Sequence, residues 1–389
     1  MSSDQGIING RIERQLAEIS GSGLWRELVE ISELNLCSND YLGLSQDAEI
    51  KAAAVRAVAE SKSIASTGSR LLSGHERVWE QLEEEFAVFA GTASALYFSS
   101  GYLANVGLIT SLLTKEDTVF SDALNHASLI DGIRLSGARK VIYPHCDTNA
   151  LEDLLINHHS GGARLIVTES IFSMDGDRAP LREMVDLAAQ YGAEIIVDEA
   201  HATGVEGSHG EGITAAMGLE DQVLAVVHTC GKALACMGAF VCGSASLKQY
   251  LLNRARTFIF STAMPGYFAE QIGAALKRVQ RMHAERAYLQ QISRRLRAHL
   301  NKVGIPANSC SQIVPLIVGR NETASRLATY LGARGFGIRA IRPPTVPAGS
   351  ARLRFSLTTR ISEADVDRLA DSINSYFSCK HEECVGARK

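Results

Sequence analysis

The sequence lacks an excess of charge of either sign. Its 389 residues include 39 Lys and Arg against 43 Asp and Glu, which gives a formal net charge of −4. This balance creates no general electrostatic field for nucleic acid or for an anionic membrane surface, and we expect neither as a partner. Internal repeats and low-complexity tracts are also missing. Because 46% of the residues are hydrophobic, burial can offset the ordering entropy, which excludes disorder for the bulk of the chain.

Paired cysteine motifs are absent as well. None of the eight cysteines forms a C-x-x-C pair, and several lie in apolar runs, as Cys242 does in A-F-V-C-G. We therefore expect buried free thiols in a reducing cytoplasm. The tail C-K-H-E-E-C holds Cys379, His381 and Cys384 but no second ligand pair, so a frayed end is expected there and no metal.

An uninterrupted apolar segment of the kind used for targeting is not found. The first residues contain no apolar h-region, so we expect no secretory signal and a cytoplasmic protein. Residues 86–114 carry no charge, but glycines, serines and an asparagine interrupt them. A strand, a glycine turn and a buried helix explain that stretch better than a membrane span does.

Short apolar runs alternate with helix-length segments such as 148–158 and 181–191. Most of these runs are uniformly apolar, as in strands buried on both faces. The alternation predicts an α/β fold with a mostly parallel, seven-stranded sheet, which binds ligands at the carboxyl ends of its strands. The predicted strands are 95–99, 118–122, 140–144, 165–169, 194–198, 225–229 and 239–243.

The division into domains follows from the change of pattern along the chain. A helix is expected at about 7–19, and residues 1–45 are predicted to be an N-terminal arm. Residues 46–285 form the predicted large domain, and 286–389 a smaller α+β domain. The stretch from Pro265 to about Leu300 has apolar residues at helical spacing and is predicted to be one helix leaving the first domain.

Lys232 and Asp198 are candidates for a covalent cofactor site. Lys232 follows a strand among small apolar residues, where desolvation lowers the pKa of an amine and favours Schiff-base chemistry. Alone, Lys232 is better explained as a solvent-facing lysine. Asp198 ends another strand, and its carboxylate would suit a pyridine nitrogen, with His201 bonding the ring oxygen. A helix cap and a satisfied core histidine explain that pair equally well.

Further candidates follow other strands of the same sheet. Gly101 and Tyr102 open a helix whose free N–H groups would bind phosphate, and the Thr229 hydroxyl would join them. His126 would stack on an aromatic ring, although a cap or surface histidine is the better explanation in isolation. Because all these residues follow parallel strands at one edge, together they predict a pocket for pyridoxal phosphate.

Six motifs, taken as an ordered set, resemble the α-oxoamine synthases, pyridoxal-phosphate enzymes of the aspartate aminotransferase fold. The resemblance covers roughly residues 24–375. The last motif is most similar to the branch that forms 8-amino-7-oxononanoate in biotin synthesis. The motifs are N-D-Y-L-G-L, G-S-R-L-L-S-G, F-S-M-D-G-D, V-D-E-A-H-A-T-G-V, T-C-G-K and I-R-P-P-T-V-P-A-G-S-A-R-L-R.

The resemblance implies a role for each matching residue. Lys232 would hold the cofactor covalently, Asp198 would pair with the ring nitrogen, His201 would bond the ring oxygen, and His126 would stack over the ring and meet the substrate. Other residues would complete the sites: Gly101, Tyr102, Ser173 and Thr229 at the cofactor, Thr262 at the phosphate of a neighbouring subunit in a homodimer, Arg26 and Thr345 at the acyl substrate, and Arg354 at the amino-acid carboxylate.

The sequence departs from the family pattern in three places. Glu199 and Ala202 replace the usual residues of V-D-D-A-H-G-T-G. Ala65 and Thr67 stand where a more glycine-rich run is usual, and A-L-A-C-M-G follows Lys232 where the family often has more glycine. The extra side chains near the lysine would narrow the acyl entrance.

The resemblance implies a decarboxylative condensation of L-alanine with a pimeloyl thioester, carried by coenzyme A or by acyl-carrier protein. Three alternatives remain at this point. A glycine-using member of the family, namely glycine C-acetyltransferase or 5-aminolevulinate synthase, would differ in the amino acid. A simple aminotransferase would share the fold. A non-enzymatic scaffold protein would not take up pyridoxal phosphate.

Overall fold

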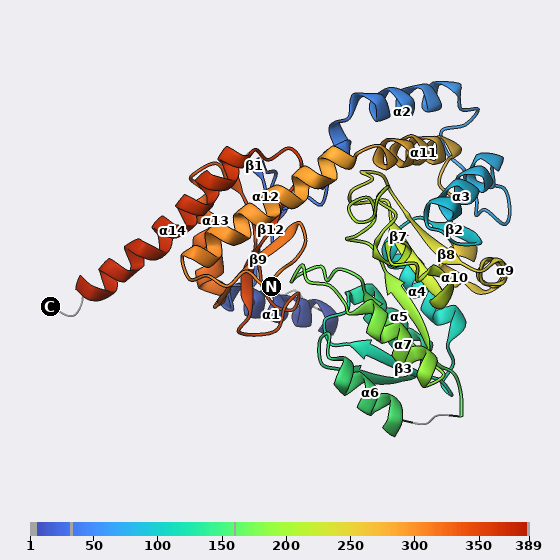
Figure 1. Ribbon diagram of the computed structural model, residues 1–389, viewed down its shortest axis with the longest axis horizontal. Helices are drawn as coiled ribbons and strands as arrows, with labels where there is room; N and C mark the ends of the chain where they lie inside the picture. The colour runs from blue at the N-terminus through green and yellow to red at the C-terminus, as the bar shows by residue number, and fades with distance from the viewer. Residues whose placement is uncertain (1–5, 32–33, 159–160, 387–389) are drawn as a thin grey trace. The chain divides into compact units, whose positions relative to one another are not determined.

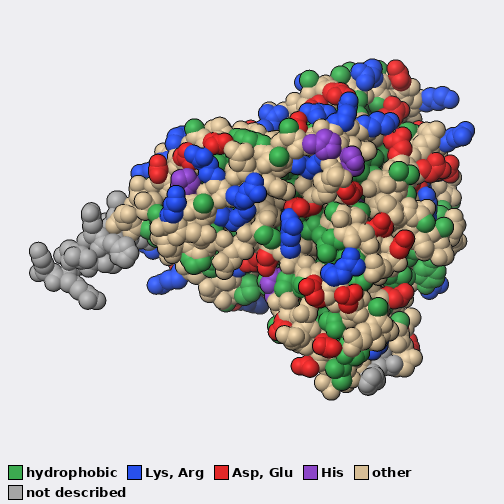
Figure 2. Space-filling view, in the orientation of Figure 1, with side chains coloured by type: hydrophobic (Ala, Val, Ile, Leu, Met, Phe, Trp, Pro, Cys, Tyr) green, Lys and Arg blue, Asp and Glu red, His purple; other side chains and the backbone are tan. Residues whose placement is uncertain are grey.

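The computed structural model of the chain describes residues 6–31, 34–158 and 161–386, with side-chain environments up to residue 378 (Figure 1). The tail residues Cys379, His381 and Cys384 lie outside the described side chains. Within the described ranges, we find no helix that has both the length and the apolar character needed to cross a bilayer. On the face shown in Figure 2, acidic and basic side chains are interspersed.

The chain divides into two compact units. The larger unit comprises Asn39–Gln291 and Thr358–Arg360. The smaller unit holds the described residues before Asn39, together with Ile292–Leu357 and the chain from Ile361 onward. The observed boundaries fall after Ser38 and Gln291, whereas the sequence pattern placed them near 45 and 285.

The larger unit is built around a seven-stranded sheet, and the predicted α/β fold is confirmed. The strand order is β2-β8-β7-β6-β5-β3-β4, and every strand is parallel except β8, which is antiparallel to both of its neighbours. Uniformly apolar strands are buried here on both faces, as expected for a parallel sheet. The strands are β2 (Ser94–Phe98), β3 (Thr118–Asp122), β4 (Arg139–Tyr143), β5 (Arg164–Glu169), β6 (Glu194–Asp198), β7 (Ala225–Thr229) and β8 (Ala239–Gly243).

Helices connect and cover these strands (Figure 1). Ser100 caps α4, because its hydroxyl accepts a hydrogen bond from the N–H of Leu103 at 3.1 Å. One apolar cluster joins α4, α5, α9 and α10 to the sheet, including Leu96, Leu108 and Ile133. The helices of this unit are α2 (Ala48–Glu60), α3 (Arg77–Phe89), α4 (Gly101–Leu112), α5 (Ala127–Ser136), α6 (Thr148–Asn157), α7 (Leu181–Gln190), α8 (Ile213–Ala216), α9 (Ala245–Arg254), α10 (Arg256–Ile259) and α11 (Gly266–Gln280), with 3-10 turns η1 (Leu44–Gln46) and η2 (Glu220–Gln222).

The prediction of one helix from Pro265 to Leu300 is wrong. Two helices occupy that stretch, α11 and α12 (His283–Lys302). The carbonyl of Val279 accepts the N–H of Met282 at 3.0 Å and a guanidinium N–H of Arg286 at 2.7 Å. These two donors take the place of the backbone N–H that would bond this carbonyl in a continuing α-helix. Helix α11 therefore closes in a tight turn, and α12 starts after it. The helical spacing of hydrophobic residues in the sequence continues across the break, because Met282 in the turn is also buried.

The smaller unit contains an antiparallel sheet of order β11-β12-β9 and a short parallel pair, β1 with β10. On β12, residues 351–356 are all buried, including Arg352 and Arg354. Helix α1 has no buried residue, and α12 contains the unit boundary. The elements are α1 (Ile7–Gly21), β1 (Leu34–Asn35), β9 (Ile313–Gly319), α13 (Asn321–Gly332), β10 (Phe336–Gly337), β11 (Ala340–Ile341), β12 (Ala351–Ser356) and α14 (Glu363–Gly386).

Candidate active site

A cavity of about 470 Å³ opens at the carboxyl ends of the parallel strands. Its lining comes from the turns that follow β2, β3, β6 and β7, from the last residue of β5, and from Asn39. The parallel arrangement brings these turns together, because all of the contributing strands end at one edge of the sheet. The predicted cofactor residues in the lining are Gly101, Tyr102, His126, Asp198, His201, Thr229 and Lys232.

Lys232 projects from a tight loop after β7. The N–H of Cys236 donates to the carbonyl of Cys230 at 2.9 Å, and the N–H of Ala235 donates to the carbonyl of Lys232 itself. Ala235 adopts a left-handed φ of 50°, which normally favours glycine. Since Ala233 and Leu234 are fully buried, the base of this loop is fixed in the core while Lys232 is half-buried at the cavity.

Asp198 is held by two donors at the bottom of the cavity. Asn105 Nδ2 donates to one carboxylate oxygen at 2.7 Å, and the N–H of Ala200 donates to the other at 2.8 Å. Asn105 Nδ2 also reaches the Ser128 hydroxyl at 2.9 Å. The sequence interpretation missed Asn105, which appears there only as a polar residue inside an apolar helix.

His126 occupies the start of α5 and faces the same cavity. Its Nδ1 accepts a hydrogen bond from the N–H of Ser128 at 3.3 Å, so the side chain also caps the helix, and the Ser128 hydroxyl lies 2.8 Å from the same nitrogen. Burial lowers the pKa of His126, Asp198 raises it and Lys232 lowers it further, with the net shift downward. A neutral imidazole is therefore favoured, which is suited to lying flat over an aromatic ring.

Glu169 is a second residue of the cavity lining that the sequence interpretation missed. It is the last residue of β5, directly beside Asp198 in the register of β5 and β6, and only 2% exposed. Burial, followed by the nearby Asp198, raises the pKa of Glu169 to about 8, against smaller lowering effects of Lys232 and the N–H groups of His126 and Ser173. Its Oε1 is buried without a hydrogen-bond partner.

The end of the cavity at which the sequence predicts a phosphate is shaped by a close contact. A Cβ on Gly101 would lie 2.6 Å from Thr229 Cγ2, so a larger residue there would require the Thr229 side chain to shift. The Tyr102 hydroxyl donates to Asp131. Among the described residues, Ser173 and Thr262 do not line this cavity. Thr262 lines a separate small pocket.

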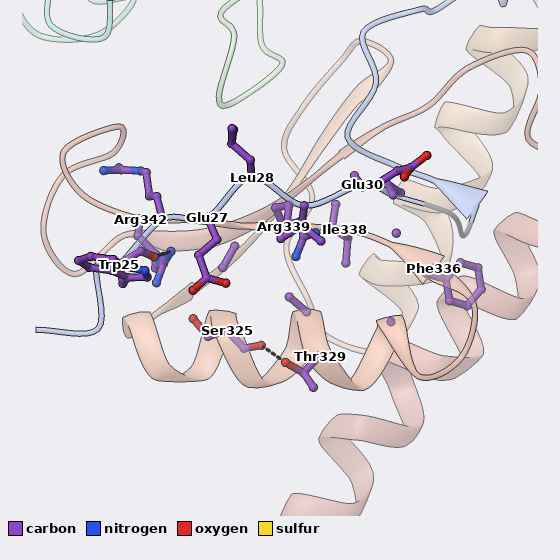
Figure 3. A pocket seen from close by; sticks show the side chains of 17 residues that line it. Trp25, Glu27, Leu28, Glu30, Ser325, Thr329, Phe336, Ile338, Arg339 and Arg342 are labelled. Carbon is purple, nitrogen blue, oxygen red and sulfur yellow. Dashed lines mark hydrogen bonds between the residues drawn. The ribbon is translucent and has the colours of Figure 1, made fainter. Parts of the chain in front are cut away.

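The predicted substrate residues Arg26, Thr345 and Arg354 belong to the smaller unit. Arg26 lines a cavity of about 920 Å³ together with residues of α13, residues 336–340 and Arg342 (Figure 3). Figure 3 shows Trp25 next to Arg342, whose guanidinium donates to the Trp25 carbonyl at 3.2 Å. Arg354 is 7% exposed and donates to the Ser356 hydroxyl at 2.6 Å, whereas Thr345 is exposed.

A polar cluster lies outside the cavity and was not anticipated. His145 contacts Asp122 at 2.9 Å through Nδ1 and Asp177 at 2.8 Å through Nε2, with Cys146 beside it. Burial lowers the pKa of His145, but the two carboxylates outweigh it and raise the pKa to about 12. Because both ring nitrogens already face carboxylates, the cluster is best explained as a charged link between the turns after β3, β4 and β5.

The chain is similar to known proteins over most of its length. The family model for class I and II aminotransferases matches residues 31–373. An 8-amino-7-oxononanoate synthase of Geobacter sulfurreducens is 45% identical over 359 residues, which covers 91% of this chain and 92% of the relative.

Solved structures of serine palmitoyltransferase and of an 8-amino-7-oxononanoate synthase are also similar to this chain. The serine palmitoyltransferase of Sphingomonas wittichii is 29% identical with a TM-score of 0.87, covering 96% of this chain and 98% of that one. Another structure of serine palmitoyltransferase is described with pyridoxal phosphate. The 8-amino-7-oxononanoate synthase of Francisella tularensis is 29% identical with a TM-score of 0.78, covering 90% and 99% of the two chains.

Proposed function

Because the chain belongs to the class I and II aminotransferase family, we propose that it uses pyridoxal phosphate to condense L-alanine with a pimeloyl thioester. The products are 8-amino-7-oxononanoate, carbon dioxide and the free thiol carrier, as in biotin synthesis. The observation that carries this function is the cavity that gathers Lys232, Asp198, His201 and His126, in a chain 45% identical to an 8-amino-7-oxononanoate synthase.

The cavity fits the cofactor in charge and in shape. The missing side chain of Gly101 leaves room for a phosphate to approach the backbone at the start of α4. Asp198 supplies a carboxylate for a ring nitrogen, and the unpartnered oxygens of Asn105 and Glu169 are placed to meet a polar ligand. When bound, pyridoxal phosphate supplies an aldehyde for the amine and a ring that withdraws electrons from the substrate α-carbon.

The residues of the cavity have separate tasks in the proposed reaction. Lys232 Nζ would hold the cofactor at its aldehyde and, when free, would take the proton from the alanine α-carbon and later return one. Asp198 would face the ring nitrogen of the cofactor, and Asn105 and the N–H of Ala200 hold its carboxylate in place. His126 would stack against the ring and limit the position of the substrate. Lys232 is thus the proposed acid and base, and the other residues orient the cofactor and the substrate.

The substrate residues are assigned by the motifs they belong to. Arg354 binds the alanine carboxylate through its guanidinium, and Arg26 and Thr345 meet the pimeloyl group. By their motifs, Ser173 and Thr262 are assigned to the cofactor, although neither lines the cavity of this chain; Thr262 would reach the phosphate of the neighbouring subunit of a homodimer. The enzyme is expected in the cytoplasm, with coenzyme A or acyl-carrier protein as the acyl carrier.

The test is a product assay on the purified full chain. Incubation with L-alanine and either pimeloyl-coenzyme A or pimeloyl-acyl-carrier protein should yield 8-amino-7-oxononanoate with one of the carriers. Lys232→Ala should abolish both the visible absorbance of the lysine–cofactor linkage and turnover, whereas the exposed-lysine control Lys115→Ala should retain both. Retention of absorbance and turnover by Lys232→Ala would overturn the assignment.

The choice of amino acid substrate needs a separate experiment. The reason is that serine palmitoyltransferase matches the fold with a higher TM-score than the Francisella tularensis synthase does. The 45% identity to a synthase that forms 8-amino-7-oxononanoate outweighs that match, since serine palmitoyltransferase is only 29% identical. Alanine, glycine and serine should therefore be compared with the same thioester. Faster turnover with glycine or serine would show a different member of the α-oxoamine synthases.

A further inference from the structure

Tyr41 connects the segment before α2 to the turn that carries His201. Its side chain is fully buried, and Leu42 beside it is 3% exposed. The N–H of Thr359 donates to the carbonyl of Tyr41 at 2.9 Å, which fixes the backbone of this segment. The left-handed Gly204 ends the His201 turn, where a Cβ would lie 3.7 Å from Leu42 Cδ1. The segment that contains Tyr41 and the turn that carries His201 are therefore packed against each other.

The hydrogen bonds in this contact have a direction. Tyr41 Oη lies 2.6 Å from His201 Nδ1, and the same hydroxyl donates to Asn39 Oδ1 at 3.1 Å. An amide oxygen only accepts hydrogen bonds, and a hydroxyl has a single proton to donate. With that proton on the side of Asn39, the hydroxyl oxygen accepts from His201, so the proton between Tyr41 and His201 belongs to Nδ1.

This direction has a consequence for the second ring nitrogen. A neutral histidine that carries its proton on Nδ1 has a bare Nε2, which accepts hydrogen bonds and cannot donate them. The role proposed for His201 requires a donor toward the ring oxygen of the cofactor. A histidine that donates from both nitrogens at once is the imidazolium.

We propose that Tyr41 is a positioning residue for His201: its oxygen accepts the Nδ1 proton, fixes the imidazole plane, and allows His201 to donate toward the cofactor only as the imidazolium. This inference rests on the proposed function for the identity of the acceptor. The hydrogen-bond chain from Asn39 through Tyr41 to His201 is independent of it.

Several charges act on an imidazolium at this place. Asp198 from β6 and Glu169 from β5 line the same cavity, and each favours the positive form when ionised. Lys232 after β7 and His126 after β3 also line it, and each opposes the positive form when protonated. Covalent attachment of the cofactor uses the Lys232 amine, so the balance of charge around His201 differs with and without the cofactor.

The direct test is the tautomer of His201, measured by nitrogen NMR on the full chain labelled in histidine, with and without pyridoxal phosphate. The His201 signals are assigned from their loss in His201→Gln. We expect a protonated Nδ1 in the cofactor-free protein and two protonated nitrogens in the holoenzyme. A bare Nδ1 in both forms would overturn the proposal.

A variant of Asn39 tests the direction of the chain. The carboxylate introduced by Asn39→Asp can only accept from Tyr41, so this variant should keep the wild-type tautomer of His201. A switch to a newly protonated Nδ1 in Asn39→Asp would show that the native chain runs the opposite way, and the proposal would fail.

Tyr41→Phe removes the hydroxyl but keeps the ring. Loss of the imidazolium beside the ring oxygen should raise the spectral midpoint of the lysine–cofactor linkage by about 0.5–1 pH unit. Tyr143→Phe, at another fully buried tyrosine outside the cavity lining, should leave the midpoint unchanged. A merely structural role for Tyr41 predicts lower stability with an unchanged midpoint and tautomer.

These readouts separate the inference from the function on which it builds. Failure to bind pyridoxal phosphate would refute the proposed function, and the tautomer of the cofactor-free protein would still test Tyr41. Normal condensation activity with a bare Nδ1 would refute the role of Tyr41 alone.

Discussion

Glu169→Gln should change how the stability of the protein depends on pH. The folded chain raises the pKa of Glu169 from its ordinary value of 4.5 to about 8, mainly because the carboxyl is buried and also because Asp198 lies beside it. Between these two values the folded protein holds a proton that the unfolded chain has released. Stability therefore falls as the pH rises through this window and levels off above it.

The size of the effect follows from the shift. One pKa unit corresponds to about 1.36 kcal/mol, so this carboxyl lowers the free energy of unfolding by up to about 5 kcal/mol between pH 4.5 and pH 8. Glutamine has nearly the same shape as the protonated acid and does not titrate. The variant should match the wild type near pH 5 and become increasingly more stable than the wild type toward pH 8.

The assay is denaturant unfolding of the cofactor-free protein between pH 5 and pH 9, because bound cofactor would add its own stabilisation. Glu194→Gln, at the exposed start of β6, is the control and should follow the wild-type profile. A difference between Glu169→Gln and wild type that stays constant within about 1 kcal/mol across this range would refute the reasoning.

Three further predictions concern other positions. Gly101→Ala should weaken binding of pyridoxal phosphate at least about tenfold in a fluorescence titration, because its Cβ would lie 2.6 Å from Thr229 Cγ2, whereas Gly161→Ala meets no atom within 4 Å and should bind normally. His145→Gln should lower the melting temperature most near pH 6 and progressively less at higher pH. The reason is that a histidine with a pKa raised to about 12 stabilises the fold below pH 6.5 and loses that effect as the pH rises. An equal decrease of the melting temperature at pH 6 and pH 10 would contradict this prediction. Ala235→Gly should stabilise the protein by about 0.5–1 kcal/mol in the same unfolding assay, because φ at this position is 50°, and a destabilised variant would contradict it.

The sequence predicted the sheet almost residue by residue, because strands buried on both faces leave a simple pattern. The runs 118–122, 194–198, 225–229 and 239–243 match β3, β6, β7 and β8 without a shift. The break between α11 and α12 escaped prediction for a physical reason. Arg286 ends the first helix by reaching back to the Val279 carbonyl, and such a contact has no signature in hydrophobic periodicity.

The same contrast applies to the candidate site. Lys232, Asp198, His201 and Gly101 were predicted to share one pocket, because each lies at or just after the end of a recognisable strand and parallel strands end together. Glu169 also ends a strand, but a glutamate at a strand end is usually exposed, and only the fold shows its burial. Tyr41 stood in a motif without an assigned role, because its partner His201 is 160 residues away.

The register of β5 and β6 explains why this site contains a neutral acid. Paired residues on adjacent parallel strands project to the same face, so Glu169 and Asp198 are forced close together. Two buried carboxylates at that distance cannot both ionise without a large penalty, and a proton on one relieves it. Asn105 and the N–H of Ala200 donate to Asp198, while Glu169 Oε1 has no donor. The N–H groups of His126 and Ser173 lower the pKa of Glu169 less than burial and the neighbouring Asp198 raise it, so this carboxyl keeps its proton up to a pKa of about 8.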